Sequence, residues 1–415
     1  MKVLNLLTLL SLASSTLLFA EEKNSELEVY ISDIKKEQFN YDYEKNEAES
    51  SKLRDSWIAP LRINYSYSVS NPYENKNKDD QQSQNASLRL DQPIFQSGGI
   101  YYGIKFADAS REYSQYSIDV AKRKMIKDAV SFLMQIKQTD LSIKRQALQI
   151  ENSNINLELK KEQYLNGQLD SGFLDNAVIE KNFVIQKLYD IETAKERLIS
   201  RFNAISDLNY ENAYVPHLEL LSEEEFLKYN IILKVADSRI QRDLYSKNMT
   251  ITKYLPSVSV TGGYNWTKND NQYFSVDGSG NPIGASQELD YYDYGVRASL
   301  PLDINTFRDI ESSRVDYLKS EVMKKDKIVQ LKALFDQVMH NLENYDKKEL
   351  LSIEIKDIYS KLLNDTQDLY KAGYKTQYDV NLLQNSVKIS ELDLKIYEMD
   401  KQLELLTLYE MYIKE

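Results

Sequence analysis

The sequence predicts a mixed α/β membrane protein in which four strands of bilayer length alternate with very long helices. Three observations lead to this fold class. Four segments alternate apolar and polar side chains with a period of two, residues 102–165 and 306–372 form helical runs almost free of proline and glycine, and this whole pattern occurs twice along the 415-residue chain.

Composition narrows the range of functions. The chain has 52 Lys and Arg against 64 Asp and Glu, a net charge of −12, which argues against nucleic-acid binding. It has no cysteine and 2 histidines, His217 and His340, so disulfides, thiol catalysis and nearly all histidine-based zinc sites are excluded and no cofactor is expected. The 31 tyrosines suit a surface that is apolar on one side and wet on the other.

Residues 1–20 are predicted to be a secretory signal peptide. Lys2 precedes an apolar run from Leu4 to Phe19, and Ala20 stands before Glu21, where we expect the mature chain to begin. No cysteine follows to carry a lipid, and no later stretch reaches the ~18 apolar residues of a transmembrane helix. We therefore expect an exported protein that does not span a membrane with helices.

Four strands are predicted, at residues 61–70, 85–91, 257–267 and 292–300, with polar loops at 71–84 and 268–290. The first strand shows the alternation, with one face formed by Leu61, Ile63, Tyr65, Tyr67 and Val69. Strands of about ten residues match the span of a tilted strand in a bilayer, although a soluble sheet with one half-buried face would alternate in the same way. Four strands are too few to close a membrane barrel, so several chains would have to share one.

The helical runs are long enough to reach far beyond a compact domain. At ~1.5 Å per residue each would extend about 95–100 Å. Two return helices show heptad spacing, with Lys195 inside the first seam and an interruption at Glu410 in the second. The seam residues are Val184, Leu188, Ile191, Leu198, Phe202 and Ile205, and then Ile389, Leu392, Ile396, Met399, Leu403, Leu406 and Ile413. Coiled-coil packing and ordinary bundle packing both fit these stripes.

The chain repeats itself with a period of about 205 residues. The first repeat is predicted at 21–208 and the second at 222–415, each consisting of a helix, two strands and a long helical hairpin, with a linker at 209–221. A capping box at Ser222 to Glu225 is expected to start the first helix of the second repeat, and Thr376 to Asp379 has the T-x-x-D pattern of a helix start.

Three segments carry a resemblance to a known family: Tyr370 to Asp379, Gln92 to Gly99 and Lys253 to Ser257. In this order and spacing they resemble the TolC-like outer-membrane efflux proteins, or outer membrane factors, over nearly the whole mature chain. The resemblance implies a homotrimer in the outer membrane of a Gram-negative bacterium, with one shared 12-stranded barrel in the lipid and a coiled-coil helical tunnel in the periplasm. It also implies docking on a membrane-fusion adaptor and an inner-membrane RND, ABC or MFS pump. The trimer number rests on the resemblance, because four copies would also close a barrel.

The resemblance also assigns site residues. Tyr370 and Lys375 correspond to residues whose contacts between protomers hold the tunnel mouth closed, and Asp379 corresponds to an acidic ring at the constriction. An alternative for Asp379 is an ordinary helix-capping acid, and both roles can hold together. Gly167 and Gly373 correspond to hairpin tips that an adaptor approaches.

Two positions depart from the family pattern. Leu382 replaces a second aspartate, so the acidic ring should be weaker. Asp175 lies eight residues after Gly167, whereas Asp379 lies six after Gly373, so we expect the first tip to differ in shape.

The predicted function is the exit duct of a tripartite efflux pump or a type I secretion system. A carboxylate hydrolase is not expected, because no acid pair is singled out by its spacing and heptad helices offer no pocket. The alternative is a soluble periplasmic coiled-coil scaffold or adaptor. The sequence leaves the cargo open between drugs, metals and proteins.

Overall fold

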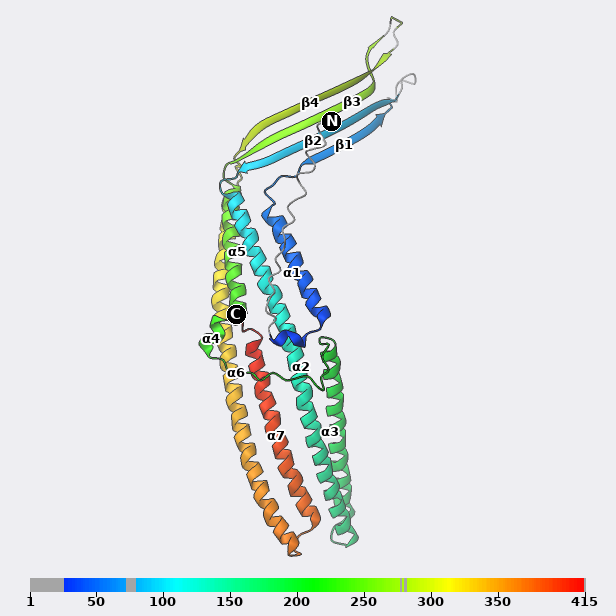
Figure 1. Ribbon diagram of the computed structural model, residues 1–415, viewed down its shortest axis with the longest axis vertical. Coiled ribbons are helices and arrows are strands. Elements are labelled where there is room, and N and C mark those ends of the chain that lie inside the picture. Colours follow the sequence, from blue (N-terminus) through cyan, green and yellow to red (C-terminus); the bar gives the residue numbers. More distant parts are fainter. Residues whose placement is uncertain (1–25, 72–79, 277, 280–281, 414–415) are drawn as a thin grey trace.

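The chain folds into a long helical bundle with a four-stranded sheet at one end (Figure 1). The computed structural model describes residues 26–71, 80–276, 278–279 and 282–413. The predicted signal peptide at 1–20 lies outside the described residues, as does most of the loop between the first two strands.

The sheet is antiparallel and has the order β1-β2-β3-β4. Its strands are β1 (Arg62–Ser70), β2 (Gln81–Phe95), β3 (Ser257–Val276) and β4 (Pro282–Ser299). One register row joins Ile63, Leu88, Tyr264 and Tyr292, one residue from each strand. All four side chains are exposed, so the predicted alternation places apolar residues on one uncovered face.

Three strands are longer than predicted. Residues 81–84 belong to β2, and most of the predicted loop at 268–290 belongs to β3 and β4. Beyond Trp266 the apolar face also carries polar side chains, such as Lys268 and Asp270 on β3, so the hydrophobic alternation stops while the backbone ladder continues. β2 also runs past Pro93, which lacks an N–H group, and its register with β3 shifts between Pro93 and Phe95.

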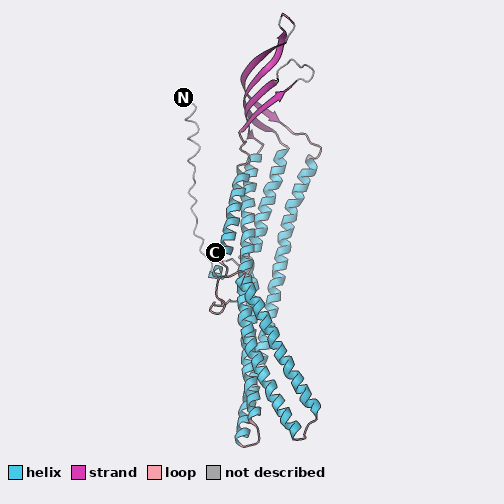
Figure 2. Ribbon diagram, turned by 90° about the vertical axis from the view of Figure 1, so that its right-hand side faces the viewer, coloured by secondary structure: helices cyan, strands magenta, loops and turns pink. Residues whose placement is uncertain are grey.

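Two helices, α2 (Gly99–Leu165) and α6 (Thr306–Lys371), run along nearly the whole bundle and confirm the predicted long helices. The shorter helices flank them (Figures 1 and 2). Near the sheet lie α1 (Asp33–Arg54), packed on α2, and α5 (Ile231–Lys253), packed on α2 and α6. At the far end α3 (Ser171–Asn203) pairs with α2, and α7 (Gln377–Tyr409) packs on both α6 and α2.

The described helices include none that is both long and apolar enough to cross a membrane.

The predicted seam residues of α3 and α7, and Ile205 and Ile413 just beyond the ends of these helices, are buried or half-buried. The two polar residues in or near the seams are paired. Lys195 places its Nζ 2.7 Å from a carboxylate oxygen of Asp140 on α2. This hydrogen bond raises the pKa of Lys195 above its ordinary value of 10.5. Glu410 lies 3.7 Å from the Nζ of Lys127.

The hydrophobic core sits at the waist, where the middle of α2 meets the middle of α6 and the chain crosses from one half to the other. The short helix α4 (Glu223–Lys228) contributes Phe226, which is fully buried and stacks on Phe335 of α6 with ring centroids 5.9 Å apart. Leu218, in the segment predicted as a linker, is buried, and its amide donates to Gln402 Oε1 at 2.7 Å. Residues 209–221 are therefore packed against the core.

The predicted helix start at Ser222 is confirmed, but that helix is short. Ser222 Oγ accepts from the Glu225 amide at 3.2 Å, and α4 ends at Lys228. The long helix α5 begins afresh, with Asn230 as its N-cap. At the break the chain pairs with the C-terminal segment, since the Ile231 amide donates to the Met411 carbonyl and the Ile413 amide donates to the Tyr229 carbonyl, both at 2.8 Å.

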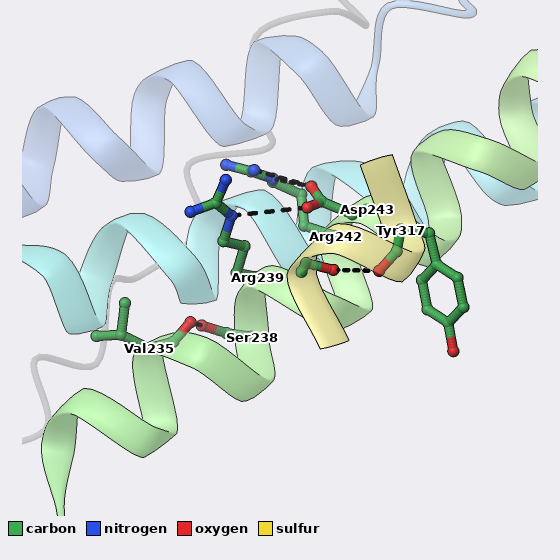
Figure 3. A network of polar contacts seen from close by, with 7 residues as sticks. Val235, Ser238, Arg239, Arg242, Asp243 and Tyr317 are labelled. Carbon is green, nitrogen blue, oxygen red and sulfur yellow. Dashed lines mark hydrogen bonds and ion pairs between the residues drawn. The ribbon is translucent and has the colours of Figure 1, made fainter. Parts of the chain in front are cut away.

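A polar network ties α5 to its neighbour. Figure 3 shows Arg239, Arg242 and Asp243 together on α5. Asp243 accepts from Arg242 at 2.8 Å and lies 3.7 Å from Arg239. The Arg242 guanidinium also lies over the ring of Tyr113 on α2, 4.4 Å from its centroid, which is a cation–π contact.

Candidate gate at the helical hairpin tips

The predicted site residues lie at the two helical turns farthest from the sheet (Figure 1). One turn joins α2 to α3 and contains Gly167; the other joins α6 to α7 and contains Gly373. Both glycines adopt left-handed backbone, with φ of +70° and +82°. A side chain at such a position is strained whatever space surrounds it.

Both turns end their helix with the same hydrogen bonds. The Gly373 amide donates to the Tyr370 carbonyl at 3.0 Å, and the Tyr374 amide donates to the Leu369 carbonyl at 2.9 Å. The Gly167 and Gln168 amides make the equivalent bonds to Tyr164 and Gln163, both at 2.9 Å. This is a Schellman motif, in which a left-handed glycine satisfies carbonyl groups that the helix leaves free.

The expectation that the two tips differ in shape is wrong for the backbone. In each turn the next helix is capped by the third residue after the glycine, Asp170 in the first and Thr376 in the second. Asp175 does not belong to the turn, because it lies inside α3. The tips differ in side chains instead: Phe173 stands three residues after its cap, where Asp379 stands in the second tip, and it is 52% exposed.

Space around the two glycines is open. No atom lies within 4 Å of where a Cβ would stand on Gly167 or Gly373. The left-handed backbone alone therefore explains why both positions are glycine, because no neighbouring atom would clash with a side chain there. The open surface leaves room for a partner.

Asp379 caps its own helix. Its Oδ2 accepts from the Thr376 amide at 2.9 Å, while Thr376 Oγ1 accepts from the Asp379 amide at 3.3 Å, which is a reciprocal capping box. Lys375 Nζ lies 3.7 Å from Asp379 Oδ1. The hydrogen bond from the Thr376 backbone, with smaller help from the Thr376 hydroxyl and Lys375, lowers the pKa of Asp379 below its ordinary value of 3.8. The carboxylate is therefore ionised at neutral pH.

The three predicted gate residues lie at the same turn, but only two of them contact each other. Lys375 and Asp379 form an ion pair within the chain, with side chains 44% and 31% exposed. Tyr370 is in the last turn of α6, is 43% exposed and makes no side-chain hydrogen bond within the described part of the chain. Its hydroxyl is thus available to a neighbouring molecule.

Sequence reasoning missed Asp170, the N-cap of α3, whose Oδ1 accepts from the Gly172 amide at 2.8 Å. The signal was present, because an aspartate three residues after a helix-ending glycine is a strong N-cap candidate. It also missed Tyr374, which follows the tip glycine and is 82% exposed.

No protein-family model and no curated protein sequence matches the chain. Solved structures match along almost its full length. The outer membrane protein VceC from Vibrio cholerae has 15% identity and a TM-score of 0.67, over 91% of this chain and 93% of VceC. The Campylobacter jejuni CmeC outer membrane channel has 12% identity and a TM-score of 0.66, over 94% and 86%. The Neisseria gonorrhoeae MtrE outer membrane channel in its open state has 13% identity and a TM-score of 0.62, over 92% and 86%. The chain therefore has the fold of these outer-membrane channels, which confirms the TolC-like α/β fold that its sequence predicts.

Proposed function

We propose that the chain is one protomer of an outer-membrane channel of a Gram-negative bacterium, with its helical bundle in the periplasm. In this proposal the channel is the exit duct of a tripartite efflux pump or a type I secretion system. The observation that carries it is the sheet, which has an uncovered apolar face and two outer edges without a strand partner among the described residues, on a chain whose fold matches outer-membrane channels over almost its full length.

The sheet supports membrane insertion by energetics. Tyr292, Tyr294 and Val296 are 76%, 84% and 72% exposed, and the outer edges of β1 and β4 have no strand partner in the described chain. In water the apolar face would be exposed to solvent. In lipid the backbone N–H and C=O groups at the sheet edges would lack hydrogen-bond partners unless another chain pairs with them. Joining β4 of one copy to β1 of the next satisfies the edge groups, so the sheet can then place its apolar face in lipid. We propose three copies, giving 3 × 4 = 12 strands, on the strength of the family resemblance.

The soluble scaffold is not favoured, because it would leave the same tyrosine-rich face in water. The structural neighbours are channel proteins, and the proposal assigns the chain no catalysis. Its proposed partners are outer-membrane lipid, further copies of itself, a membrane-fusion adaptor at the Gly167 and Gly373 tips, and an inner-membrane pump. The cargo is set by the pump and is not assigned.

We further propose that Tyr370, Lys375 and Asp379 form the gate. The capping role of Asp379 is compatible with this, because the cap holds the carboxylate charged and fixed in position at the mouth. A ring of such charges in a narrow bore attracts cations and repels anions.

Location and stoichiometry can be tested together. Membranes are fractionated, extracted with detergent, and the purified protein is weighed by native mass spectrometry. We expect the protein in the outer-membrane fraction, released only by detergent, with a mass of three chains. A stable water-soluble monomer would contradict the channel proposal, whereas another closed stoichiometry would contradict only the trimer.

The gate is tested in planar bilayers. We expect a small conductance with cation preference, a weaker preference in Asp379→Asn, and a larger conductance when Tyr370→Phe is combined with Lys375→Ser. Asp175→Asn removes the same charge from the other tip, outside the turn, and should keep the preference. If folded assemblies of every variant conduct alike, the gate residues are wrongly assigned.

A further inference from the structure

The polar face of the sheet concentrates its charged residues in one band at the end next to the helices. Arg62 stands directly opposite Arg89, which stands opposite Gly263, which in turn stands opposite Asp293. Asp91 and Arg297 occupy the next two rows toward the helices, opposite Thr261 and Ser259 of β3. Farther from the helices, the described residues of this face are uncharged, and include Asn64, Ser66, Asn85, Ser87, Asn265 and Thr267.

The band has more positive than negative charge. Three arginines face two aspartates, which leaves one excess positive charge per chain (3 − 2 = 1). Arg297 lies 3.2 Å from Asp91, and Arg89 lies 3.8 Å from Asp293, whose carboxylate leans over the bare backbone of Gly263.

Arg62 has no carboxylate partner among the described residues. It also faces a second arginine on the neighbouring strand, an arrangement that destabilises a sheet when like charges lie directly opposite. Within one copy, Arg62 is therefore the arginine of the band that a carboxylate neutralises least. The band residues are also well exposed, with Arg89 and Arg297 side chains 65% and 66% accessible.

We infer that this basic band, formed by Arg62, Arg89 and Arg297, attracts anions inside the barrel and favours solutes with anionic groups. The inference rests on the proposed function, because only a closed barrel with its apolar face in lipid turns the polar face into a water-filled lumen. Each copy adds its excess charge to the same ring, and a low-dielectric wall strengthens the resulting field. The band is opposite in sign to the Asp379 ring at the other end of the conduit.

The chain contains no cysteine, so one introduced thiol can report the local potential without any current through the gate. Ser87→Cys places the thiol on the same face, two residues or about 7 Å from Arg89. The full-length protein in liposomes is treated with a sulfonate-bearing or a trimethylammonium-bearing methanethiosulfonate. The reaction rate of each reagent with the introduced thiol is divided by its reaction rate with a small free thiol. We expect this relative rate to be higher for the anionic reagent.

Variants in which glutamine replaces arginine supply the decisive comparison, because they remove positive charge from the band. Arg62→Gln with Arg89→Gln changes the net charge of the face from +1 to −1 per chain. At about 0.1 M salt the anionic-to-cationic rate ratio should fall about fivefold. Arg62→Gln alone breaks no ion pair in the described chain, so it tests the band without disturbing the sheet, and it should shift the ratio part of the way.

Two controls test whether the effect is local to the band and to its face of the sheet. A thiol at Ser83→Cys lies about 13 Å farther along the strand than one at Ser87 and should respond less to the same arginine variants. Lys268→Gln removes a positive charge from the opposite face and should leave the ratio at Ser87→Cys unchanged. A ratio that ignores the arginine variants would overturn the basic band while leaving the channel intact. A thiol that reacts with neither reagent in folded, membrane-inserted protein would overturn the proposed function and the inference with it.

Discussion

Replacing Gly373 by alanine should loosen the α6–α7 tip by an amount that the backbone sets. Gly373 has φ of +82°, where an alanine costs ~1–2 kcal/mol. No atom lies within 4 Å of the added Cβ, so no clash adds to this cost. Alanine also restricts the unfolded chain, which offsets about 0.4–1 kcal/mol. The net loss is therefore about 1 kcal/mol, which corresponds to roughly fivefold faster opening of the tip.

Hydrogen exchange followed by mass spectrometry measures this directly, since the Gly373 and Tyr374 amides both donate bonds in the turn. Gly373→Asn should be nearer the wild type, because asparagine tolerates left-handed backbone. Gly167→Ala should behave like Gly373→Ala, since the two turns share their geometry. Gly103, inside α2 and with the same open space around it, is the matched control, and Gly103→Ala should stabilise its helix. If Gly373→Ala and Gly103→Ala change exchange alike, the left-handed backbone is not why Gly373 is glycine.

Further predictions concern the helix caps, the helix seams and the core. Thr376→Ala removes one half of the capping box and should destabilise the start of α7 by about 1 kcal/mol, measured as faster amide exchange there. The contribution of Asp379 to the capping box depends on pH, because folding lowers the pKa of Asp379 from 3.8. The stabilisation by its carboxylate is complete above pH 3.8 and is lost as the pH falls through the lower pKa of the folded state. Amide exchange at the tip, corrected for its intrinsic pH dependence, should therefore accelerate in acid. Lys195→Met should cost less than about 1 kcal/mol in thermal unfolding, because Asp140 is partly exposed and can rehydrate. Phe226→Ala should cost about 3–5 kcal/mol in denaturant unfolding, because the ring is fully buried in the waist core.

Two of these predictions have a simple control. Asp379→Asn should abolish the acid dependence at the tip, and if the acceleration persists the titrating group is another one. Ile34→Ala, at a 68% exposed position on α1, should leave unfolding nearly unchanged, unlike Phe226→Ala. A loss of several kcal/mol in Lys195→Met would mean that the ion pair is far less solvated than its exposure indicates.

Charges of opposite sign at the two ends give the proposed conduit two filters. The Asp379 carboxylate is held at the tip by its own helix, so it needs no neighbouring protomer to stay ionised. Arg62, on the edge strand β1, has no carboxylate partner among the described residues of its own copy. A closed gate would therefore favour cations, and an open one would expose the solute to the basic band of the barrel.

Much of the fold could be predicted from local patterns. The alternation through Ile63, Leu88 and Tyr292 gave the position and the apolar face of the strands, because one face must meet a single environment. The absence of proline and glycine from 306–372 gave the length of α6, because nothing in that run interrupts the helical ladder. Glycine in left-handed backbone ended both long helices at the predicted tips.

The errors came where backbone pairing or a distant segment decides. β3 and β4 extend beyond Trp266 because hydrogen bonds between strands need no apolar face, so no pattern in the side chains marks where they end. At the break before Asn230 the chain pairs with the C-terminal segment at Met411, a contact with a distant segment that no local pattern shows. The similar shape of the two tips depends on where each cap falls, and the spacing of Asp175 did not reveal it.

The sequence by itself determined where the strands lie, the extent of the long helices, the places where they turn back and the chemical character of each face, because these depend on neighbours within a few residues. Only the tertiary structure decided that Lys195 pairs with Asp140, that Phe226 completes the waist core and that Arg62 faces Arg89. These contacts join residues that lie far apart along the chain or whose register a long loop leaves open. Their energies depend on which surfaces meet, and that is fixed only when the whole chain has packed.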